Sequence, residues 1–316
     1  TQLDRYRANL EGRERLDVAP ADAAVDVESL ATIGEELVHA RACLACHKLG
    51  DEDGTIAPDL SFEGLLRDET WLMEHFLNPR SVVSDSIMPT FRYLESDFEA
   101  MTAFLATLTT PPEVESPEQT YSVFCARCHG DNGAGDGPTE LYLDPSPRDL
   151  TKSAFMNSKT PERLLTSIVK GVPGTSMPPW EKVLTQDQMQ GVLDHVLVTF
   201  VTEPRRERKP RKIPEQNPVA VSDESVARGE AIYLRRCTGC HGLKGDGKGP
   251  NSPDILPRPR NLRNSHFIDS LSDRRILESI LYGVQGTAMP PWIDYGLSQN
   301  DAGDVANFIR SLNVRR

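Results

Sequence analysis

Apolar residues recur at helical spacing in six stretches of the chain, and no stretch alternates between apolar and polar positions as a strand does. In the last stretch, Val305, Phe308, Ile309 and Leu312 share one side of a helix, which is typical of a helix with one buried face. The pattern therefore predicts an all-α protein. The predicted helices cover residues 27–42, 96–108, 117–124, 185–201, 223–236 and 298–312.

Hydroxyl residues that cap helices stand at the start of several predicted helices. Thr185 and Ser298 each precede an apolar-periodic stretch, where a side-chain oxygen accepts a hydrogen bond from a free N–H of the first turn. Ser222 and Ser225 are alternative caps for the helix over residues 223–236. The helices occur in pairs, and each pair brackets one cysteine-containing segment.

The six cysteines form three Cys-x-x-Cys pairs, and a histidine directly follows each pair. Cys-x-x-Cys-His is the attachment signal of c-type haem, because two thiols on one helical turn reach the two vinyl groups of the porphyrin. A redox dithiol or half of a zinc site is the alternative for one such motif, but three copies favour haem. The prediction is three covalent haem c groups on Cys43, Cys46, Cys125, Cys128, Cys237 and Cys240, with His47, His129 and His241 as proximal iron ligands.

Two of the three motifs belong to closely matching repeats. A glycine-rich stretch follows each His-Gly, and a Met-Pro-Pro-Trp segment follows later. Met177 lies 48 residues after His129, and Met289 lies 48 residues after His241. The first copy diverges, with Met88 only 41 residues after its histidine and no glycine-rich stretch.

Each repeat offers a methionine as the sixth iron ligand. Met88, Met177 and Met289 all precede a proline, and a thioether opposite histidine is the ligand set of electron-carrying cytochromes c. Core filling is the alternative role of a methionine. Met73 is the rival of Met88, and His266 is the rival of Met289.

Residues near the predicted ligands suggest further haem contacts. An axial histidine commonly donates its second ring N–H to a carbonyl, and Pro58, Pro147 and Pro259 are the predicted sources of that carbonyl.

Two arginines and two tryptophans recur at matching positions of the close repeats. Arg148 and Arg260 are predicted to pair with haem propionates, the alternative being ordinary surface charge. Trp180 and Trp292 are the last residues of the Met-Pro-Pro-Trp segments, which contain the predicted methionine ligands. They are predicted to pack on the haem edge, with core filling as the alternative.

Length and composition predict several small domains. The chain has 316 residues with an apolar fraction of 38% and only 6% aromatics, which is low for one large core and typical of small domains completed by a cofactor. A basic, proline-spaced stretch reads as a solvated linker, or else as a segment that binds acidic surface. The predicted parts are an N-terminal extension (1–25), domain 1 (26–110), domain 2 (111–203), the linker (204–222) and domain 3 (223–316).

Charge and hydropathy exclude some partners. The formal net charge of −12 argues against nucleic acid, and no apolar run reaches the length of a transmembrane segment. The chain begins with Thr1, so we expect that a leader or anchor has been removed.

The repeats resemble the class I cytochrome c family over roughly residues 28–316. Domain 1 is similar to single-haem modules with Pro-Asp-Leu (58–60) and Trp-Leu (71–72), and the others resemble the variety with a Met-Pro-Pro-Trp segment. The resemblance implies three tandem domains of a few helices around one haem, with the first and last helices crossing. Domain 2 departs from the pattern because Pro117 stands where the first helix of the others has Gly34 or Gly229, so a short first helix is expected.

The resemblance also implies one-electron transfer on the periplasmic or extracytoplasmic face of a bacterial membrane. The expected role is a relay subunit without a catalytic site of its own, with redox proteins as partners, in a membrane-associated respiratory complex. The alternative is a multihaem oxidoreductase with one open haem, such as a peroxidase or an enzyme of sulfur or nitrogen compounds. A haem-lined conduit of polymerised chains is the third hypothesis.

Overall fold

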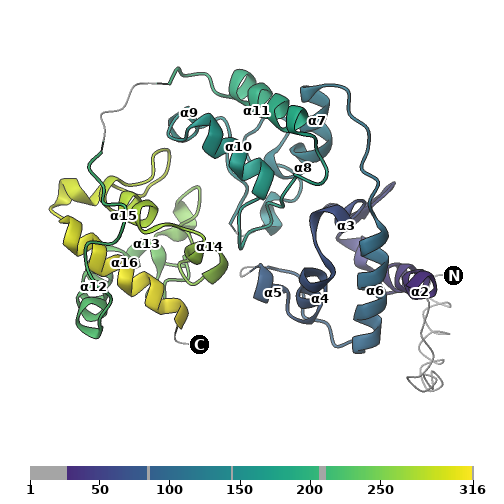
Figure 1. Cartoon of the computed structure of the whole chain (residues 1–316), viewed down its shortest axis with the longest axis horizontal. Coiled ribbons are helices and arrows are strands. Elements are labelled where there is room, and N and C mark those ends of the chain that lie inside the picture. The colour runs from purple at the N-terminus through teal and green to yellow at the C-terminus, as the bar shows by residue number, and fades with distance from the viewer. Residues whose placement is uncertain (1–26, 84–85, 144, 206–210, 315–316) are drawn as a thin grey trace. The chain divides into compact units, whose positions relative to one another are not determined.

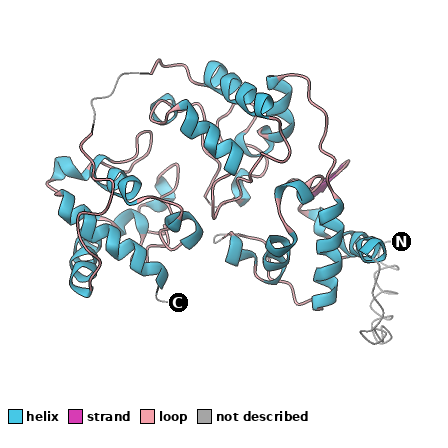
Figure 2. Ribbon diagram, viewed as in Figure 1, coloured by secondary structure: helices cyan, strands magenta, loops and turns pink. Residues whose placement is uncertain are grey.

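The computed structural model describes residues 27–83, 86–143, 145–205 and 211–314, so the predicted N-terminal extension lies outside the described residues. Helices and long loops make up nearly all of the described chain (Figure 2), which confirms the all-α prediction. Its only strands are β1 (Lys48–Leu49) and β2 (Glu52–Asp53), a short antiparallel hairpin that the sequence did not predict. The chain divides into two compact units, one with residues 1–78 and 89–111 and the other with residues 79–88 and 112–316.

The first unit holds two long helices that cross closely. A Cβ built on Gly34 of α2 (Val27–Ala40) would lie 2.0 Å from the carbonyl oxygen of Ala100 in α6 (Glu95–Thr107), so only glycine allows this approach (Figure 1). Phe98, Met101 and Leu105 of α6 are buried beneath the other helices. The elements are α2 (Val27–Ala40), the 3-10 helix η2 (Cys43–Ala45), α3 (Glu63–Leu66), α4 (Glu69–Leu77) and α6 (Glu95–Thr107).

The second unit contains both close repeats and the short helix α5 (Pro79–Val82). Its residues from domain 2 form α7 (Pro117–Phe124), α8 (Ala126–His129), η3 (Glu140–Tyr142), α9 (Ser153–Met156), α10 (Pro161–Lys170) and α11 (Gln186–Phe200). Its residues from domain 3 form α12 (Asp223–Arg236), α13 (Thr238–His241), η4 (Ser252–Asp254), α14 (Ser265–Asp269), α15 (Asp273–Tyr282), η5 (Trp292–Tyr295) and α16 (Gln299–Val314).

The predicted helix starts agree with the observed caps. The hydroxyl of Thr185 accepts a hydrogen bond from the N–H of Gln188, and the side chain of Gln188 accepts one from the N–H of Thr185, so α11 begins with a complete capping box. Ser222, and not Ser225, caps α12. The hydroxyl of Ser298 accepts a hydrogen bond of 3.1 Å from the N–H of Asp301 at the start of α16.

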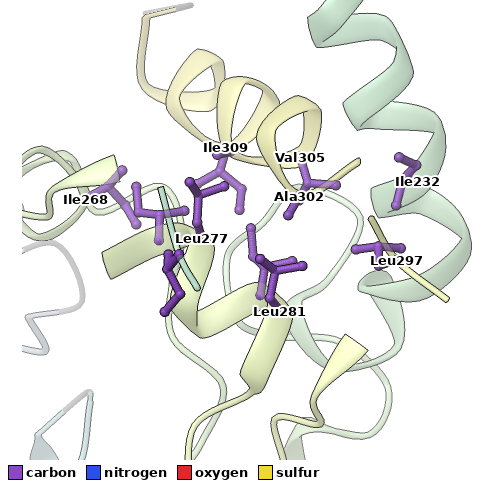
Figure 3. Close-up of a cluster of buried hydrophobic side chains, with 12 residues drawn as sticks. Ile232, Ile268, Leu277, Leu281, Leu297, Ala302, Val305 and Ile309 are labelled. Carbon is purple, nitrogen blue, oxygen red and sulfur yellow. The ribbon is translucent and has the colours of Figure 1, made fainter. Parts of the chain in front are cut away.

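An apolar cluster joins α12, α15 and α16 of domain 3 (Figure 3). Leu277 and Leu281 of α15 are fully buried against Val305 and Ile309 of α16. The i, i+4 spacing of each pair places both side chains on one face of its helix, which is the face turned to the partner helix. Ile232 supplies the contribution of α12.

Helix α7 of domain 2 is the short first helix that the sequence predicted. It has 8 residues, against 14 in α2 and in α12. Pro117 lies in the first turn of this helix. The N–H groups of the first turn have no acceptor within the helix, so a proline there costs no helical hydrogen bond. In this domain the small residue lies on the opposite helix, since a Cβ on Gly191 of α11 would lie 3.2 Å from the ring of Pro117.

Residues 211–217 of the basic stretch pack on domain 3, so the expectation of a solvated linker is wrong for this part of it. Ile213 is buried in the apolar cluster of domain 3. Asn217 donates hydrogen bonds to the carbonyl of Gly303 and the side chain of Asn307. Arg211 lies 3.3 Å from Glu278, so the charge of this stretch binds acidic surface of the protein itself.

Candidate haem-binding sites

The three Cys-x-x-Cys-His segments fold into the same helical turn. In domain 2, the N–H groups of Cys128 and His129 donate hydrogen bonds to the carbonyl of Cys125 over 3.1 and 2.9 Å. The corresponding distances to the carbonyl of Cys237 are 3.2 and 2.9 Å, and to that of Cys43 they are 3.1 and 2.9 Å. The turn therefore presents two thiols and an imidazole from one short stretch of backbone, as thioether attachment requires.

Each motif histidine donates its Nδ1–H to a backbone carbonyl. The acceptor for His47 is Pro58, as predicted, over 2.9 Å. For His129 and His241 the acceptors are Arg148 and Arg260, over 2.9 and 3.0 Å. This hydrogen bond fixes the tautomer and leaves Nε2 as the metal-ligating nitrogen. The prediction of Pro147 and Pro259 as acceptors was wrong by one residue in each repeat.

The glycine-rich loop places the carbonyl of Arg148 next to the ring of His129. Gly135 donates a hydrogen bond of 2.8 Å to the carbonyl of His129, with a φ of 79°. A Cβ on Gly135 would lie 2.8 Å from the carbonyl oxygen of Pro147, so a larger residue would push away the segment that supplies the acceptor. Leu150 then donates to the carbonyl of Gly133 over 2.7 Å and closes the loop. In domain 3 the same loop uses Gly247.

The ionisation of the motif side chains fits haem attachment better than dithiol chemistry. Burial raises the pKa of Cys125 to about 12 and that of Cys237 to about 11. Redox-active dithiols need the opposite, a lowered pKa that provides thiolate. Burial also lowers the pKa of His129 and His241, which favours the neutral imidazole that binds iron. A zinc site needs at least three such ligands, and no group of three or more His, Cys, Asp or Glu residues is arranged to hold a metal ion within the described chain.

The three candidate methionines share one local geometry. The N–H of Met177 donates 3.2 Å to the hydroxyl of Thr175, and that of Met289 donates 3.2 Å to Thr287. Met88 in the divergent repeat donates 3.2 Å to the hydroxyl of Ser86. All three repeats have a hydroxyl residue two positions before the methionine, a sequence signal of this segment that the Met-Pro pattern alone leaves out.

In the close repeats a further backbone bond holds the ligand segment. Val172 donates to the carbonyl of Met177 over 3.1 Å, and Val284 donates to that of Met289 over 3.2 Å. Met73, the rival of Met88, lies instead inside helix α4. The structure thus gives Met88 the hydroxyl contact seen at Met177 and Met289.

The arginines predicted to meet propionates each lie over an aromatic ring. The guanidinium carbon of Arg148 is 4.1 Å from the ring centre of Phe155, and that of Arg260 is 4.2 Å from the ring centre of Phe267. Burial lowers the pKa of Arg148. Stacking fixes the plane of each guanidinium, and the propionate role stays a prediction.

The two tryptophans differ in burial. Trp180 is 7% exposed and packs edge-on against Phe124 at 5.6 Å. Trp292 is half-buried and lies 5.6 Å from the guanidinium of Arg236. Trp180 therefore fills the core of domain 2 in addition to any contact with haem, and the haem-edge contact stays a prediction for both.

A buried tyrosine in each close repeat, not among the predicted site residues, contacts the attachment motif. Tyr121 donates a hydrogen bond of 2.7 Å to the carbonyl of Gly130, and Tyr233 donates one of 2.7 Å to Gly242. Each bond ties the first helix of the repeat to the residue directly after the motif histidine. The signal was present, because the two tyrosines are separated by the same interval as His129 and His241.

His266, the rival of Met289, is engaged elsewhere. Its Nε2 lies 2.6 Å from the carbonyl oxygen of Ser81, which belongs to the same compact unit. Met289 is therefore the candidate that keeps its place in the ligand segment of domain 3.

Comparisons with known proteins agree with the local geometry. The profile of the family described as "Cytochrome C oxidase, cbb3-type, subunit III" matches residues 112–196 and 224–309, more than half of the chain. The profile described as "Cytochrome C oxidase, mono-heme subunit/FixO" matches residues 54–127. Both are cytochrome c families, so the residues that match them imply covalently bound haem c.

Two individual proteins are also similar. The Cbb3-type cytochrome c oxidase subunit CcoP of Azospirillum sp. (strain B510) is 25% identical over 176 residues, which are 53% of this chain and 52% of that protein. The chain thus spans about half the length of this curated relative. A chain of the Kuenenia stuttgartiensis reducing HAO-like protein complex Kustc0457/Kustc0458 superposes with a TM-score of 0.51 at 26% identity, covering 64% of this chain and 97% of that one.

Proposed function

The chain belongs to the family of cytochrome c oxidase, cbb3-type, subunit III, and on this premise we propose that it carries electrons through three covalently bound c-type haems. The family match covers the close repeats, which hold two of the three attachment motifs. The third haem is proposed from the motif Cys43–His47, whose turn has the same hydrogen bonds as the other two.

The histidine–carbonyl contact carries the proposal. All three motif histidines donate Nδ1–H to a carbonyl over 2.9 to 3.0 Å, so each presents Nε2 from a fixed ring. Electron transfer is faster when the ligands of the iron keep their positions as the iron is reduced, because little structural rearrangement then accompanies each transfer. These hydrogen bonds support the proposal that each motif histidine is the fixed member of an electron-transfer ligand set.

When bound, haem supplies reversible one-electron chemistry, and the protein residues tune it. The residues that would hold the three irons are His47 with Met88, His129 with Met177, and His241 with Met289. A thioether ligand raises the reduction potential of the iron that it binds. A methionine on every iron would leave no open position for a substrate.

The proposed setting is a membrane respiratory oxidase or a related redox complex. The curated relative is a cbb3-type oxidase subunit, which supports a place on the periplasmic face and redox proteins as donor and acceptor. None of the helices in the described residues has the length and apolar character needed to cross a bilayer.

Haem counting and carbon monoxide titration test the proposal. The haem content of the purified protein should be three per chain, and the double variant Cys43→Ser/Cys46→Ser should contain two. Carbon monoxide should bind to none of the haems of the fully reduced protein. A content of two in the unmodified protein would remove the first site. Stoichiometric binding of carbon monoxide to one haem would support the alternative, an oxidoreductase with an open iron.

A further inference from the structure

Domains 2 and 3 meet at a buried asparagine. Asn264 is 1% exposed, and its Nδ2 donates a hydrogen bond of 2.6 Å to the carbonyl of Gly174. Its Oδ1 accepts a hydrogen bond of 3.0 Å from the N–H of Phe267 and so caps helix α14. One side chain thereby joins the start of a helix in domain 3 to a loop of domain 2.

The contact belongs to an interface with approximate two-fold symmetry. Gly286 is the counterpart of Gly174 in the repeat, and a Cβ built on it would lie 2.9 Å from the Cβ of Phe155 in α9 of domain 2. Each ligand segment therefore meets the short helix of the other domain. In a two-fold interface the same surfaces serve on both sides.

A second pair of counterparts interacts through its charges. Arg163 of α10 and Arg275 of α15 occupy equivalent positions in the two repeats. Burial, followed by the nearby charge of Arg275, lowers the pKa of Arg163. The charge of one counterpart thus acts on the other, as a two-fold arrangement of the repeats leads one to expect.

The chemistry of the two halves differs at the asparagine. Lys152 is the counterpart of Asn264, but its side chain is 60% exposed and lies 3.3 Å from Asp149 of its own domain. Gly174 is buried, whereas Gly286 is exposed. Within the described residues, Lys152 therefore gives the loop of domain 3 no counterpart of the hydrogen bond that Asn264 donates to Gly174, so the two loops are held across the interface in different ways.

The supported loop leads directly to Met177. Gly174 precedes this methionine by three residues, and its φ of 66° is one that L side chains rarely adopt. The bonds from Val172 to Met177 and from Thr175 to Val172 make residues 172–177 one closed turn. A restraint on the carbonyl of Gly174 is therefore transmitted to the backbone of Met177.

We propose that Asn264 is a positioning residue through which domain 3 holds the Met177 segment of domain 2 in place for iron ligation. The inference rests on the proposed function in one respect, because it takes Met177 as an iron ligand. The proposal makes methionine ligation in domain 2 depend on a hydrogen bond from domain 3, whereas ligation in domain 3 does not depend on the side chain of Asn264.

The test compares Asn264→Asp with Lys152→Ala in the haem-loaded full chain. Aspartate caps a helix as well as asparagine but has no N–H to donate to Gly174, so α14 keeps its cap and the loop loses its support. Asn264→Ser is the second variant, since serine also caps but does not place a charge at the interface. Lys152→Ala alters the equivalent position, which makes no such bond.

Two measurements read the outcome. Amide hydrogen exchange of residues 172–177 should become about tenfold faster in both Asn264 variants, the factor expected for one lost buried hydrogen bond. The methyl resonance of the iron-bound Met177 should be lost at a lower temperature than in the unmodified protein. Residues 284–289, the resonance of Met289 and the Lys152→Ala protein should all stay unchanged.

Either of two results would overturn the inference. Unchanged exchange and an unchanged Met177 resonance in both variants would show that the loop needs no support from domain 3. Equal losses at Met177 and Met289 would show general destabilisation instead of positioning. If the unmodified protein showed no iron-bound Met177, the proposed ligand set itself would fail, and the haem count and carbon monoxide titration would show this separately.

Discussion

Arg228 of helix α12 donates two hydrogen bonds of 2.8 Å to the carboxylate of Asp304 in helix α16. The same carboxylate accepts a third, of 2.7 Å, from the buried hydroxyl of Ser225. Burial raises the pKa of Asp304, but the hydrogen bonds from Arg228 and Ser225 outweigh it and hold the pKa below its ordinary value. The pair thus joins the first and last helices of domain 3 through one ionised group.

Replacing Asp304 with alanine should lower the free energy of unfolding by about 2 to 3 kcal/mol at pH 7, because three hydrogen bonds disappear and the hydroxyl of Ser225 loses its acceptor. Since the pKa of Asp304 is lowered in the folded state, its contribution is present above the ordinary aspartate pKa and is lost as the pH falls through the folded value. Urea unfolding at neutral and at acidic pH measures both the loss of unfolding free energy in Asp304→Ala and the pH dependence of the contribution of Asp304. Arg228→Ala should cost less, because that arginine is solvent-exposed. An Asp304→Ala protein as stable as the unmodified one would contradict the assignment.

Glu63 of helix α3 should make the first unit less stable as the pH rises. This side chain is 7% exposed, and burial, partly offset by the charge of Arg67, raises its pKa to about 7. A raised pKa means that the stabilising contribution of the protonated form is complete below the unfolded pKa and is lost as the pH rises through about 7. The loss should reach at most about 3 kcal/mol.

Thermal unfolding between pH 4.5 and 8 checks the prediction on Glu63. Glu63→Gln should remove most of the slope and stabilise the protein at pH 8, since a neutral amide replaces the buried carboxylate. Glu99→Gln, at an exposed position of α6, is the control and should leave the slope unchanged. An unmodified protein whose stability rises across this range would show that Glu63 is not the controlling group.

Gly229→Ala should destabilise domain 3 strongly. The added Cβ would lie 2.1 Å from the carbonyl oxygen of Asp304, so α12 and α16 would have to move apart and open the apolar cluster between them. Overpacking of this kind typically costs about 1 to 3 kcal/mol or more. Gly191→Ala in α11 is the matched variant, because its Cβ would meet only the ring of Pro117 at 3.2 Å. In chemical denaturation, the free energy of unfolding of Gly229→Ala should be clearly lower than that of Gly191→Ala. The reverse order would show that close packing at Gly229 does not control stability.

Met88→Ala should open the proposed first haem to carbon monoxide, whereas Met73→Ala should not. Met88 has the hydroxyl contact found at Met177 and Met289, while Met73 lies within α4. Absorption spectroscopy of the reduced variants during titration should show one binding equivalent for Met88→Ala. Binding to the Met73 variant instead would assign the sixth ligand to that residue.

Much of the helical framework could be predicted from apolar spacing and caps. The predicted helices over residues 117–124 and 223–236 match α7 and α12 residue for residue, and Pro117 correctly indicated the short helix. The predicted acceptors for His129 and His241 were wrong by one residue. Glycine allows many backbone angles, so the sequence of a glycine-rich loop does not determine which carbonyl faces the histidine. The packing of Ile213 and Asn217 was missed because charge and proline spacing describe a segment in isolation.

The sequence by itself determined the attachment chemistry, since two cysteines and a histidine on one turn are contiguous and their geometry is local. It also determined the repeat, and with it the equivalence of Met177 and Met289. Only the tertiary structure decided that Asn264 reaches Gly174, 90 residues away along the chain, while its counterpart Lys152 pairs within its own domain. The physical reason is that a local motif needs only short-range backbone geometry, whereas a contact between domains depends on how every intervening element packs.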